Sequence, residues 1–197
     1  IDPPREIKGA SSRILSQLED HGLYWDDKVL FQSTRLDAYQ NSLDILKQHN
    51  LAYHCECSRQ RVNSLEGIYD NRCRPSHLPS TNNATRLQLN QPHQLVEFVD
   101  KIAGRHVQSL IEDVGDFVIR RRDNLFSYQL AVTVDDQYQN VTHVMRGSDL
   151  LDSTPRQIYL QHCLGFTQPQ YAHLPVATSP LGQKLSKQSL ASSLISG

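Results

Sequence analysis

The chain has 197 residues, of which 38% are hydrophobic and 21% are charged, and its formal net charge at pH 7 is −1. This length and composition predict a folded globular protein with one substantial core, or a core and a smaller module. The balanced charge gives no overall indication of a nucleic-acid-binding protein. No apolar run approaches the ~20 residues that a membrane-spanning helix needs, so we expect no association with a membrane.

The start of the chain indicates whether a segment precedes it, and the cysteines indicate the redox environment of the protein. The sequence opens with IDPPRE and its only methionine is Met145, so we expect that a segment before Ile1 is missing. No segment is typical of a secretory signal, and three of the four cysteines crowd between Cys55 and Cys73. This crowding favours a metal site over disulfides and a reducing, cytoplasmic location.

The first part of the chain is typical of two helices followed by a strand. Residues 11–23 begin with serines, carry apolar residues at helical spacing and approach their end at Gly22. Residues 34–50 repeat leucine and tyrosine at helical spacing and end near Asn50. In residues 51–57, LAYHCEC, the apolar residues alternate with others, which predicts a strand.

Residues 58–83 are rich in Ser, Asn, Arg, Pro and Gly and predict an irregular segment. Thr154 and Pro155 favour the start of a helix that runs to Gly165. Strands alternating with helices predict an α/β fold, with residues 52–112 inserted as a less regular module. The predicted strands of this part lie at 84–89, 106–112, 116–121, 126–136 and 140–147.

The three crowded cysteines predict a metal site. Cys55 and Cys57 form a C-x-C pair that a strand places on one face, and Cys73 after a loop is a typical third ligand of tetrahedral zinc. The alternative is three buried or incidental cysteines. The fourth ligand stays open: His54 or His77 is favoured by general frequency, and Tyr69 or Asp70 would be a less usual oxygen ligand. Such a site would be structural, since it gives an otherwise coreless loop a fixed shape.

Residues 120–165 contain four motifs in a distinctive order: Arg-Asp, Tyr-x-x-Ala-x-x-x-Asp-Asp, Thr-His-x-x-Arg-Gly and Thr-Pro-x-Gln. This order and spacing closely resembles the catalytic domain of class I glutamyl-tRNA synthetases. KLSKQ at 184–188 resembles the second signature of that family, usually written KMSKS. The motif residues are Arg122, Asp123, Tyr128, Ala131, Asp135, Asp136, Thr142, His143, Arg146, Gly147, Thr154, Pro155 and Gln157.

The resemblance covers nearly the whole chain and implies an α/β, Rossmann-like catalytic fold with an inserted zinc-binding module. We expect residues 1–51 to end the first half of this fold and residues 52–112 to form the zinc-bearing, acceptor-binding module. Residues 113–197 would form the second half, with the KLSKQ loop. The HIGH-type motif of the family, which helps to hold ATP phosphates, and an acidic residue of its amino-acid pocket belong before Ile1.

A finer resemblance concerns the zinc pattern. The spacing C-x-C, eleven residues, Tyr, three residues, Cys resembles the zinc-bearing glutamyl-queuosine tRNA(Asp) synthetases, stand-alone paralogues that lack the anticodon-binding half. This resemblance assigns Tyr69 as the fourth ligand, beside Cys55, Cys57 and Cys73. Gln188 at the end of KLSKQ points the same way.

The resemblance implies a ligase that works in two steps. Glutamate attacks ATP, with Mg²⁺ accompanying the nucleotide, to give glutamyl-adenylate, and the glutamyl group then passes to queuosine in the anticodon of tRNA(Asp). Two rival functions are a truncated glutamyl-tRNA synthetase that charges tRNA(Glu), and a non-catalytic tRNA-binding protein derived from a synthetase. We expect a monomer.

The resemblance also implies individual roles. Lys187 would be the catalytic lysine that meets the leaving pyrophosphate as a point charge, with Lys184 assisting at ATP. Arg146 would bind the glutamate side chain, because a guanidinium matches a carboxylate bidentately, and Tyr128 would line the same pocket. The alternatives are solvated loop lysines, a salt bridge from Arg146 to Asp149 or Asp135, and a half-buried sheet aromatic at Tyr128.

Other motif residues keep two interpretations each. Asp135 and Asp136 would orient the α-ammonium group or a ribose, or belong to a turn at the end of a sheet. His143 would be a core or a catalytic histidine. The arginine clusters at 59–61 and 120–122 would contact tRNA phosphates or form solvated faces.

Overall fold

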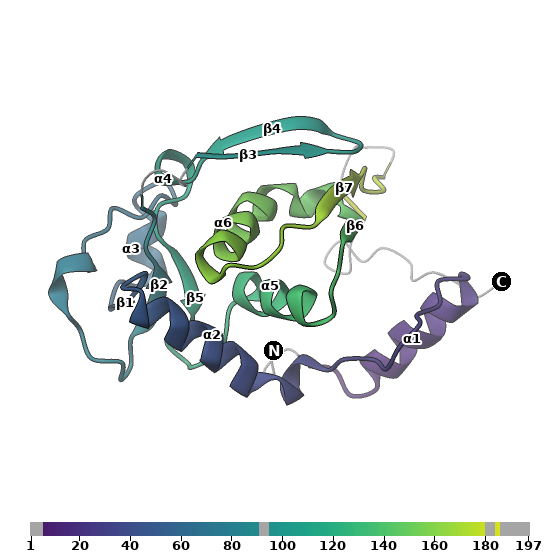
Figure 1. The fold of residues 1–197 in the computed structure, drawn as a ribbon, viewed down its shortest axis with the longest axis horizontal. Helices are drawn as coiled ribbons and strands as arrows, with labels where there is room; N and C mark the ends of the chain where they lie inside the picture. The colour runs from purple at the N-terminus through teal and green to yellow at the C-terminus, as the bar shows by residue number, and fades with distance from the viewer. Residues whose placement is uncertain (1–5, 91–94, 180–183, 186–197) are drawn as a thin grey trace. The chain divides into compact units, whose positions relative to one another are not determined.

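The computed structural model describes residues 6–90, 95–179 and 184–185. The chain divides into two compact units. The first comprises Arg35–Pro175 and holds both sheets and the main core (Figure 1). The second is drawn from Asp2–Thr34 and Val176–Gly197.

A three-stranded antiparallel sheet occupies one end of the first unit. Its order is β1 (Ala52–Cys55), β2 (Ala84–Leu87) and β5 (Phe117–Arg120). The segment between β1 and β2 is largely irregular, as its composition predicts, and holds only the short helix α3 (Arg59–Asn63) and the 3₁₀ turn η3 (Arg74–Ser76). The three cysteines lie on this segment and on the end of β1.

A four-stranded mixed sheet has the order β4-β3-β7-β6. Strands β3 (Leu95–Asp100) and β4 (Gly104–Ser109) form an antiparallel hairpin, and β6 (His143–Gly147) pairs in parallel with β7 (Gln170–Leu174). The hairpin joins β7 through one parallel contact, Asp100 with Tyr171. Asp100 therefore ends β3 where the two halves of the sheet meet.

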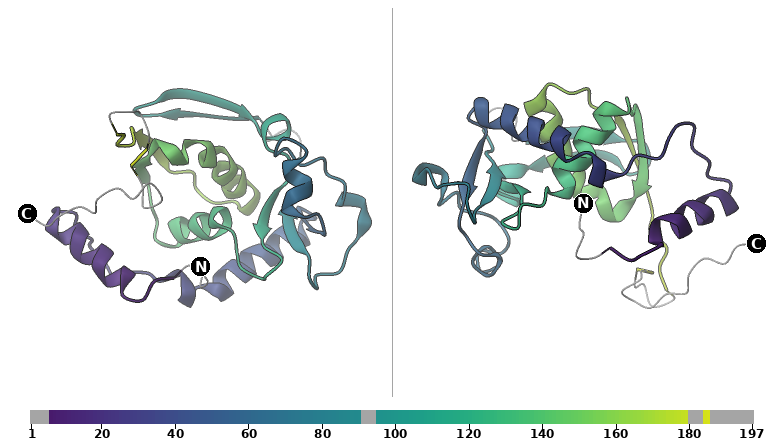
Figure 2. Two further views of the ribbon diagram at one scale, coloured as in Figure 1. Left: turned by 180° about the vertical axis from the view of Figure 1, so that it is seen from behind. Right: turned by 90° about the horizontal axis from the view of Figure 1, so that it is seen from below.

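Three longer helices of the first unit supply much of its core: α2 (Leu36–Gln48), α5 (Tyr128–Tyr138) and α6 (Thr154–Leu164). Helix α6 lies between the β3–β4 hairpin and α5 in Figures 1 and 2. The short helix α4 (Leu110–Asp113) follows β4, and the 3₁₀ segment η4 (Ser148–Ser153) joins β6 to α6. The fully buried core side chains include Tyr39, Leu43, Leu46, Leu87, Leu110, Ile119, Leu130 and Leu160.

The second unit contains helix α1 (Ala10–Asp20) and the 3₁₀ turn η2 (Gln32–Thr34). None of the residues of α1 is buried. Further along the chain, Thr178 pairs with Lys184 in an antiparallel bridge, and Leu185 N–H donates to the carbonyl of Ala177 at 2.9 Å. Within the part of the chain that the structure describes, no helix is long and apolar enough to cross a membrane.

The strand predicted at 126–136 is wrong, because these residues form helix α5. The Ser127 hydroxyl caps this helix by accepting from the N–H of Leu130, and Leu130, Ala131 and Val134 bury the side that faces the core. Three β-branched residues obscured this helical spacing. Asp135 therefore lies in a helix and not in a turn at the end of a sheet.

The remaining element predictions are mostly confirmed. Both N-terminal helices, the strands at 84–89, 116–121 and 140–147, and the helix from Thr154 to the C-cap Gly165 all form. The strand at 51–57 ends at Cys55, so Cys57 lies beyond it. The strand at 106–112 stops at Ser109 and turns into α4, and strands β3 and β7 were not predicted.

Candidate functional site

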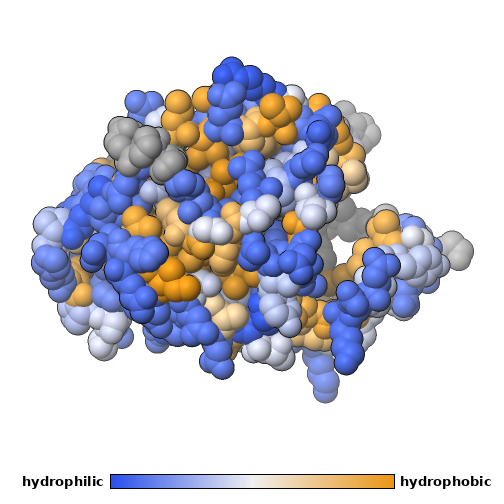
Figure 3. Space-filling model, viewed as in Figure 1, coloured by the Kyte–Doolittle hydropathy of each residue, from blue (hydrophilic) through white to orange (hydrophobic). Residues whose placement is uncertain are grey.

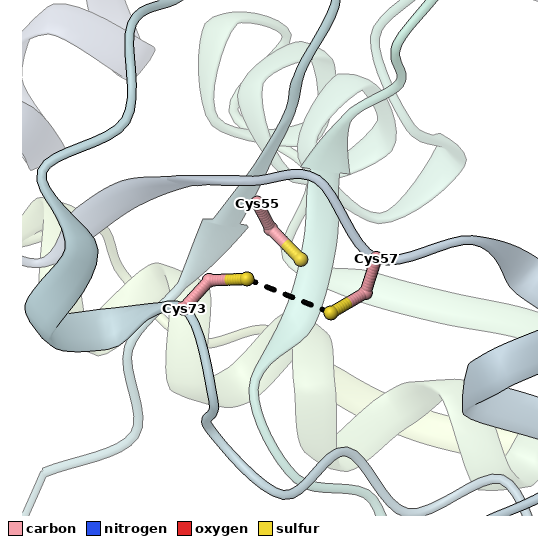
Figure 4. Close-up of side chains that lie close together, drawn as sticks. All are labelled: Cys55, Cys57 and Cys73. Carbon is pink, nitrogen blue, oxygen red and sulfur yellow. Dashed lines mark hydrogen bonds between the residues drawn. The ribbon is translucent and has the colours of Figure 1, made fainter.

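The three cysteines predicted to bind a metal come together at the edge of the three-stranded sheet. Cys55 ends β1, Cys57 follows it in a loop, and Cys73 leads into η3 (Figure 4). Their sulfurs all lie within 4.8 Å of one another, and those of Cys57 and Cys73 are 3.5 Å apart. A tetrahedral zinc ion with Zn–S bonds of about 2.3 Å places its sulfurs roughly 3.8 Å apart, so this spacing suits one ion.

The Tyr69 hydroxyl is the oxygen that lies against these sulfurs. It is 3.3 Å from Sγ of Cys55 and 3.7 Å from Sγ of Cys57, and it accepts from the backbone N–H of Cys73 at 3.0 Å. The other fourth-ligand candidates are directed elsewhere. Nδ1 of His54 lies 3.3 Å from the hydroxyl of Thr85, Asp70 pairs with Arg61, and His77 is exposed.

Two arginines border the cysteine cluster. Nε of the buried Arg86 donates to Sγ of Cys55 at 3.2 Å, and its guanidinium lies 3.7 Å above the ring of Tyr69. Arg61 reaches Sγ of Cys57 at 3.7 Å. Burial raises the pKa of the Cys55 thiol, but its hydrogen bonds with Tyr69 and Arg86 outweigh burial and leave that pKa below its usual value. Such cations favour thiolates, which are the ligand form that binds metals.

A second set of polar groups surrounds Arg146, on strand β6. Nε of Arg146 donates to Nε2 of His173 at 3.1 Å, and Nη2 donates to Thr154 and Gln157 at 2.8 Å each. Nη1 lies 3.4 Å from the Tyr128 hydroxyl. The structure therefore brings together Tyr128 and Arg146, the two residues predicted to bind glutamate.

Neither alternative considered from the sequence, a salt bridge from Arg146 to Asp149 or Asp135 or a sheet position for Tyr128, is found in the part of the chain that the structure describes. Among the described residues Arg146 makes no ion pair, since Asp135 instead bonds Arg35 at 3.2 Å and the Tyr39 hydroxyl at 2.7 Å. Tyr128 lies in the first turn of α5 with 41% of its surface exposed, so it is not a sheet residue. Both side chains can meet a ligand.

Asp136 lies close enough to Arg146 for their charges to interact. Burial raises the pKa of Asp136 to about 6, and the neighbouring Asp135 acts in the same direction, whereas the positive charge of Arg146 opposes the rise. A carboxyl group poised in this way next to a cation is typical of binding sites. Asp135, by contrast, is committed to Arg35 and Tyr39 and is structural.

The sequence pattern did not indicate Asp100, His173 or Arg86. Asp100 and His173 form a buried pair behind Arg146, with Oδ2 and Nδ1 2.6 Å apart. His143, by contrast, is exposed and lies beside Thr142, so it is not a core histidine. The only available signal for His173 was a histidine inside an otherwise apolar stretch, YAHLP.

The remaining predicted contacts are only partly described. Lys184 is exposed and Lys187 lies outside the described residues. Several arginines of the two basic clusters have protein partners. Arg61 pairs with Asp70, Arg121 with Asp123, and Arg122 donates to the carbonyl of Glu56.

Comparison with known proteins identifies the family. The chain matches the family described as "tRNA synthetases class I (E and Q), catalytic domain" over residues 1–196. A relative from Pseudomonas putida, named glutamyl-Q tRNA(Asp) synthetase, is 50% identical over 186 residues, which cover 94% of this chain and 61% of the relative. A relative of the same name from Escherichia coli is 48% identical over 198 residues, covering 100% of this chain and 63% of the relative.

The fold of a solved structure agrees. A glutamate tRNA ligase from Elizabethkingia meningosepticum superimposes with a TM-score of 0.79 at 24% identity, covering 95% of this chain and 43% of the ligase. This likeness concerns the fold. The chain spans about three fifths of the length of the named relatives. It belongs to the family of class I tRNA synthetase catalytic domains specific for glutamate and glutamine.

Proposed function

We propose that this protein activates glutamate with ATP and transfers the glutamyl group to queuosine in the anticodon of tRNA(Asp). The observation that carries the proposal is the identity of about one half to relatives named glutamyl-Q tRNA(Asp) synthetase, over nearly the whole chain. The contact between Tyr128 and Arg146 supports an amino-acid substrate with an acidic side chain.

Arg146 would bind the side-chain carboxylate of glutamate through Nη1. The sequence predicts a bidentate contact between the guanidinium and the carboxylate, but Nε and Nη2 already donate to protein acceptors on His173, Thr154 and Gln157. Nη1 contacts only the Tyr128 hydroxyl, at 3.4 Å, among the described residues. The carboxylate would therefore accept from Nη1 and from the Tyr128 hydroxyl together.

Asp136 offers a second anchor for the same ligand. Its carboxyl group lies near Arg146, and the described residues give its side chain no hydrogen bond. An ammonium group brought next to it would lower its pKa and keep it ionised. We assign Asp136 to the α-ammonium group of glutamate.

In the first step, an oxygen of the α-carboxylate attacks the α-phosphorus of ATP, a P–O bond forms, and pyrophosphate leaves with the bonding electrons. Lys187, aided by Lys184, would stabilise the charge that builds on pyrophosphate, with Mg²⁺ on the phosphates. In the second step, a hydroxyl of the cyclopentenediol of queuosine attacks the carbonyl carbon of the adenylate. The hydroxyl loses its proton and AMP leaves.

Cys55, Cys57, Tyr69 and Cys73 would hold a zinc ion. The donor set of three sulfurs and one phenol oxygen suits a tetrahedral, structural site without an open position, and Arg86 and Arg61 would balance its negative charge. The ion would fix the irregular segment between β1 and β2. The module over residues 52–112, a cytoplasmic location and a monomeric state stay predictions that accompany this proposal.

The glutamate site is tested by glutamate-dependent exchange of pyrophosphate into ATP, with the protein expressed from its full coding sequence. Arg146→Lys cannot reproduce the three contacts that orient the guanidinium, so we expect the KM for glutamate to rise about tenfold or more. Arg105→Lys is the control, because Arg105 is exposed and, among the residues that the structure describes, pairs only with Glu97. Equal KM values for both variants would contradict the assignment of Arg146.

A further inference from the structure

A buried carboxylate–imidazole pair lies directly behind Arg146. Asp100 ends strand β3 and His173 lies in β7, and both side chains are fully buried. They are 73 residues apart in the chain, with Oδ2 of Asp100 2.6 Å from Nδ1 of His173. The proposed reaction assigns neither of them a role.

Asp100 is fixed on all sides. Its Oδ1 accepts the backbone N–H groups of Ile102, Ala103 and His173 at 3.0, 2.8 and 3.1 Å. Burial alone would raise the pKa of this carboxyl, but these hydrogen bonds and the one from the His173 ring hold it well below its usual value. An ionised carboxylate only accepts, so Nδ1 of His173 must carry a proton.

Nε2, the other ring nitrogen of His173, must by contrast be without a proton. An arginine can only donate, so the contact of 3.1 Å from Nε of Arg146 needs a lone pair on Nε2 of His173. Both contacts therefore demand the same state, a neutral imidazole with its proton on Nδ1. Asp100 fixes this tautomer by accepting the Nδ1 proton, and Arg146 donates to the lone pair that the tautomer leaves on Nε2.

The consequence for Arg146 is a fixed guanidinium plane. With Nε bound to His173 and Nη2 bound to Thr154 and Gln157, only Nη1 remains directed at Tyr128 and the proposed ligand. We propose that Asp100 and His173 are positioning residues, which hold Arg146 so that Nη1 meets the side-chain carboxylate of glutamate. This inference rests on the proposed function, because it concerns the same site.

The competing role is a structural brace. Asp100 and His173 join the end of the β3–β4 hairpin to β7, and a brace needs only the bond between them. A positioning pair needs in addition the acceptor at Nε2. Two conservative variants of His173 separate these roles. The side-chain amide of asparagine can take the place of Nδ1, and that of glutamine can take the place of Nε2.

The test measures the KM for glutamate and for ATP in pyrophosphate exchange. His173→Asn keeps a donor for Asp100 and loses the acceptor for Arg146, so we expect its KM for glutamate to rise about tenfold or more. His173→Gln keeps the acceptor, so its KM should stay closer to that of the wild type. The KM for ATP should be unchanged in both variants. The opposite order, with the glutamine variant more impaired, would overturn the inference in favour of a brace.

Asp100→Asn tests the tautomer itself. The amide oxygen can keep the three backbone N–H bonds, while the amide nitrogen turns a donor toward Nδ1. The ring proton must then move to Nε2, where it opposes the N–H of Arg146. Asp116→Asn is the matched control: it removes a buried carboxylate bonded to Arg74 and Tyr53, away from Arg146, and should leave the KM for glutamate unchanged.

Nitrogen NMR of the imidazole gives a readout that does not need activity. The inference requires Nδ1–H for His173 in the wild type and Nε2–H in Asp100→Asn. Nε2–H or a doubly protonated ring in the wild type at neutral pH would refute it, whatever the activity. The expected spectra with no glutamate-dependent exchange in the wild type would instead refute the proposed function.

Discussion

The hydroxyl of Tyr69 lies where a phenol is seldom found, against the thiol sulfurs of a cysteine cluster. Its position has a local cause. The backbone of Tyr69 pairs with that of Gly115, and Cys73 N–H donates to the hydroxyl oxygen. Sequence reasoning from general ligand frequency favoured a histidine here, because loop geometry is not visible in the spacing of residues.

We predict that Tyr69→Phe lowers the affinity for zinc by about tenfold or more, because the fourth donor is lost while the ring packing stays. Competition with a coloured chelator measures this affinity. Tyr53→Phe is the control: it removes a partly buried hydroxyl bonded to Asp116 and leaves the three cysteines and Tyr69 unchanged. Equal zinc affinity in the two variants would exclude Tyr69 as a ligand.

Asp100 should make stability depend on pH. Its folded pKa is depressed, so its stabilising contribution is present at neutral pH and is lost as the pH falls below about 4, the ordinary range of aspartate. We expect Asp100→Asn to reduce the free energy of unfolding by about 1–3 kcal/mol at pH 7, with a smaller difference at pH 3. Urea unfolding at both pH values measures this. A difference that is constant with pH would show that the charge of Asp100 is unimportant.

At the scale of elements, the sequence predicted local structure better than pairing. The helices α2 and α6 and the strands β2 and β5 have clear patterns and form as expected. Helix α5 was mistaken for a strand because β-branched residues mask its buried side. Strand β3 alternates buried and exposed residues, but it follows directly on a polar stretch and was missed.

The same limit applies to the site. Tyr128 and Arg146 belong to motifs whose spacing identifies them, so the sequence could indicate both. Asp100 and His173 could not be paired from the sequence, because their contact depends on how β3 meets β7. A buried polar pair joining segments far apart in the chain has no periodic signature.

The close approach of Gly115 to the backbone of Tyr69 predicts how a substitution at Gly115 affects zinc binding. Its φ is +69°, and an added Cβ would lie 2.4 Å from the carbonyl oxygen of Tyr69 and 2.6 Å from its nitrogen. Gly115→Ala must therefore displace the backbone of Tyr69 and should weaken zinc binding as well as folding. Gly165→Ala is a matched control, since Gly165 has the same φ of +69° and nothing within 4 Å of the added atom.

The control should lose only about 1 kcal/mol of stability from backbone strain, with its zinc affinity unchanged. Zinc titration and thermal unfolding of both variants decide the matter. If both variants bind zinc as the wild type does, the contact between Gly115 and Tyr69 does not position the fourth ligand.

At the scale of the molecule, the two sheets of the first unit differ in how their surroundings are packed. The four-stranded sheet packs on α6 and contributes to the main core, and the outer face of its β3–β4 hairpin carries both apolar and polar side chains at the top of Figure 3. The exposed side chains of the hairpin include the apolar Leu95, Val99, Ile102 and Val107 and the charged Glu97 and Arg105. The loop between β1 and β2 has only a small separate cluster, formed by Cys55, Tyr69 and Cys73.

We therefore predict that removal of zinc loosens only part of the molecule. With a chelator, amide hydrogen exchange should accelerate over residues 56–83, while β6 and β7 stay protected and the KM for glutamate is unchanged. Cys57→Ser should show the same pattern without the chelator. Loss of protection across β6 and β7 would mean that the metal supports the whole unit.

The central claim is the identity of the acceptor, and transfer of labelled glutamate tests it most directly. The protein expressed from its full coding sequence would receive glutamate, ATP and one of three RNAs: tRNA(Asp) with queuosine, the same tRNA without it, or tRNA(Glu). Nuclease digestion then locates the label at the anticodon or at the 3′ end. We predict label only on tRNA(Asp) with queuosine, in its anticodon fragment. Label at the 3′ end of tRNA(Glu) would contradict the proposal and indicate an ordinary glutamyl-tRNA synthetase, and label on none of the three would indicate a tRNA-binding protein without transferase activity.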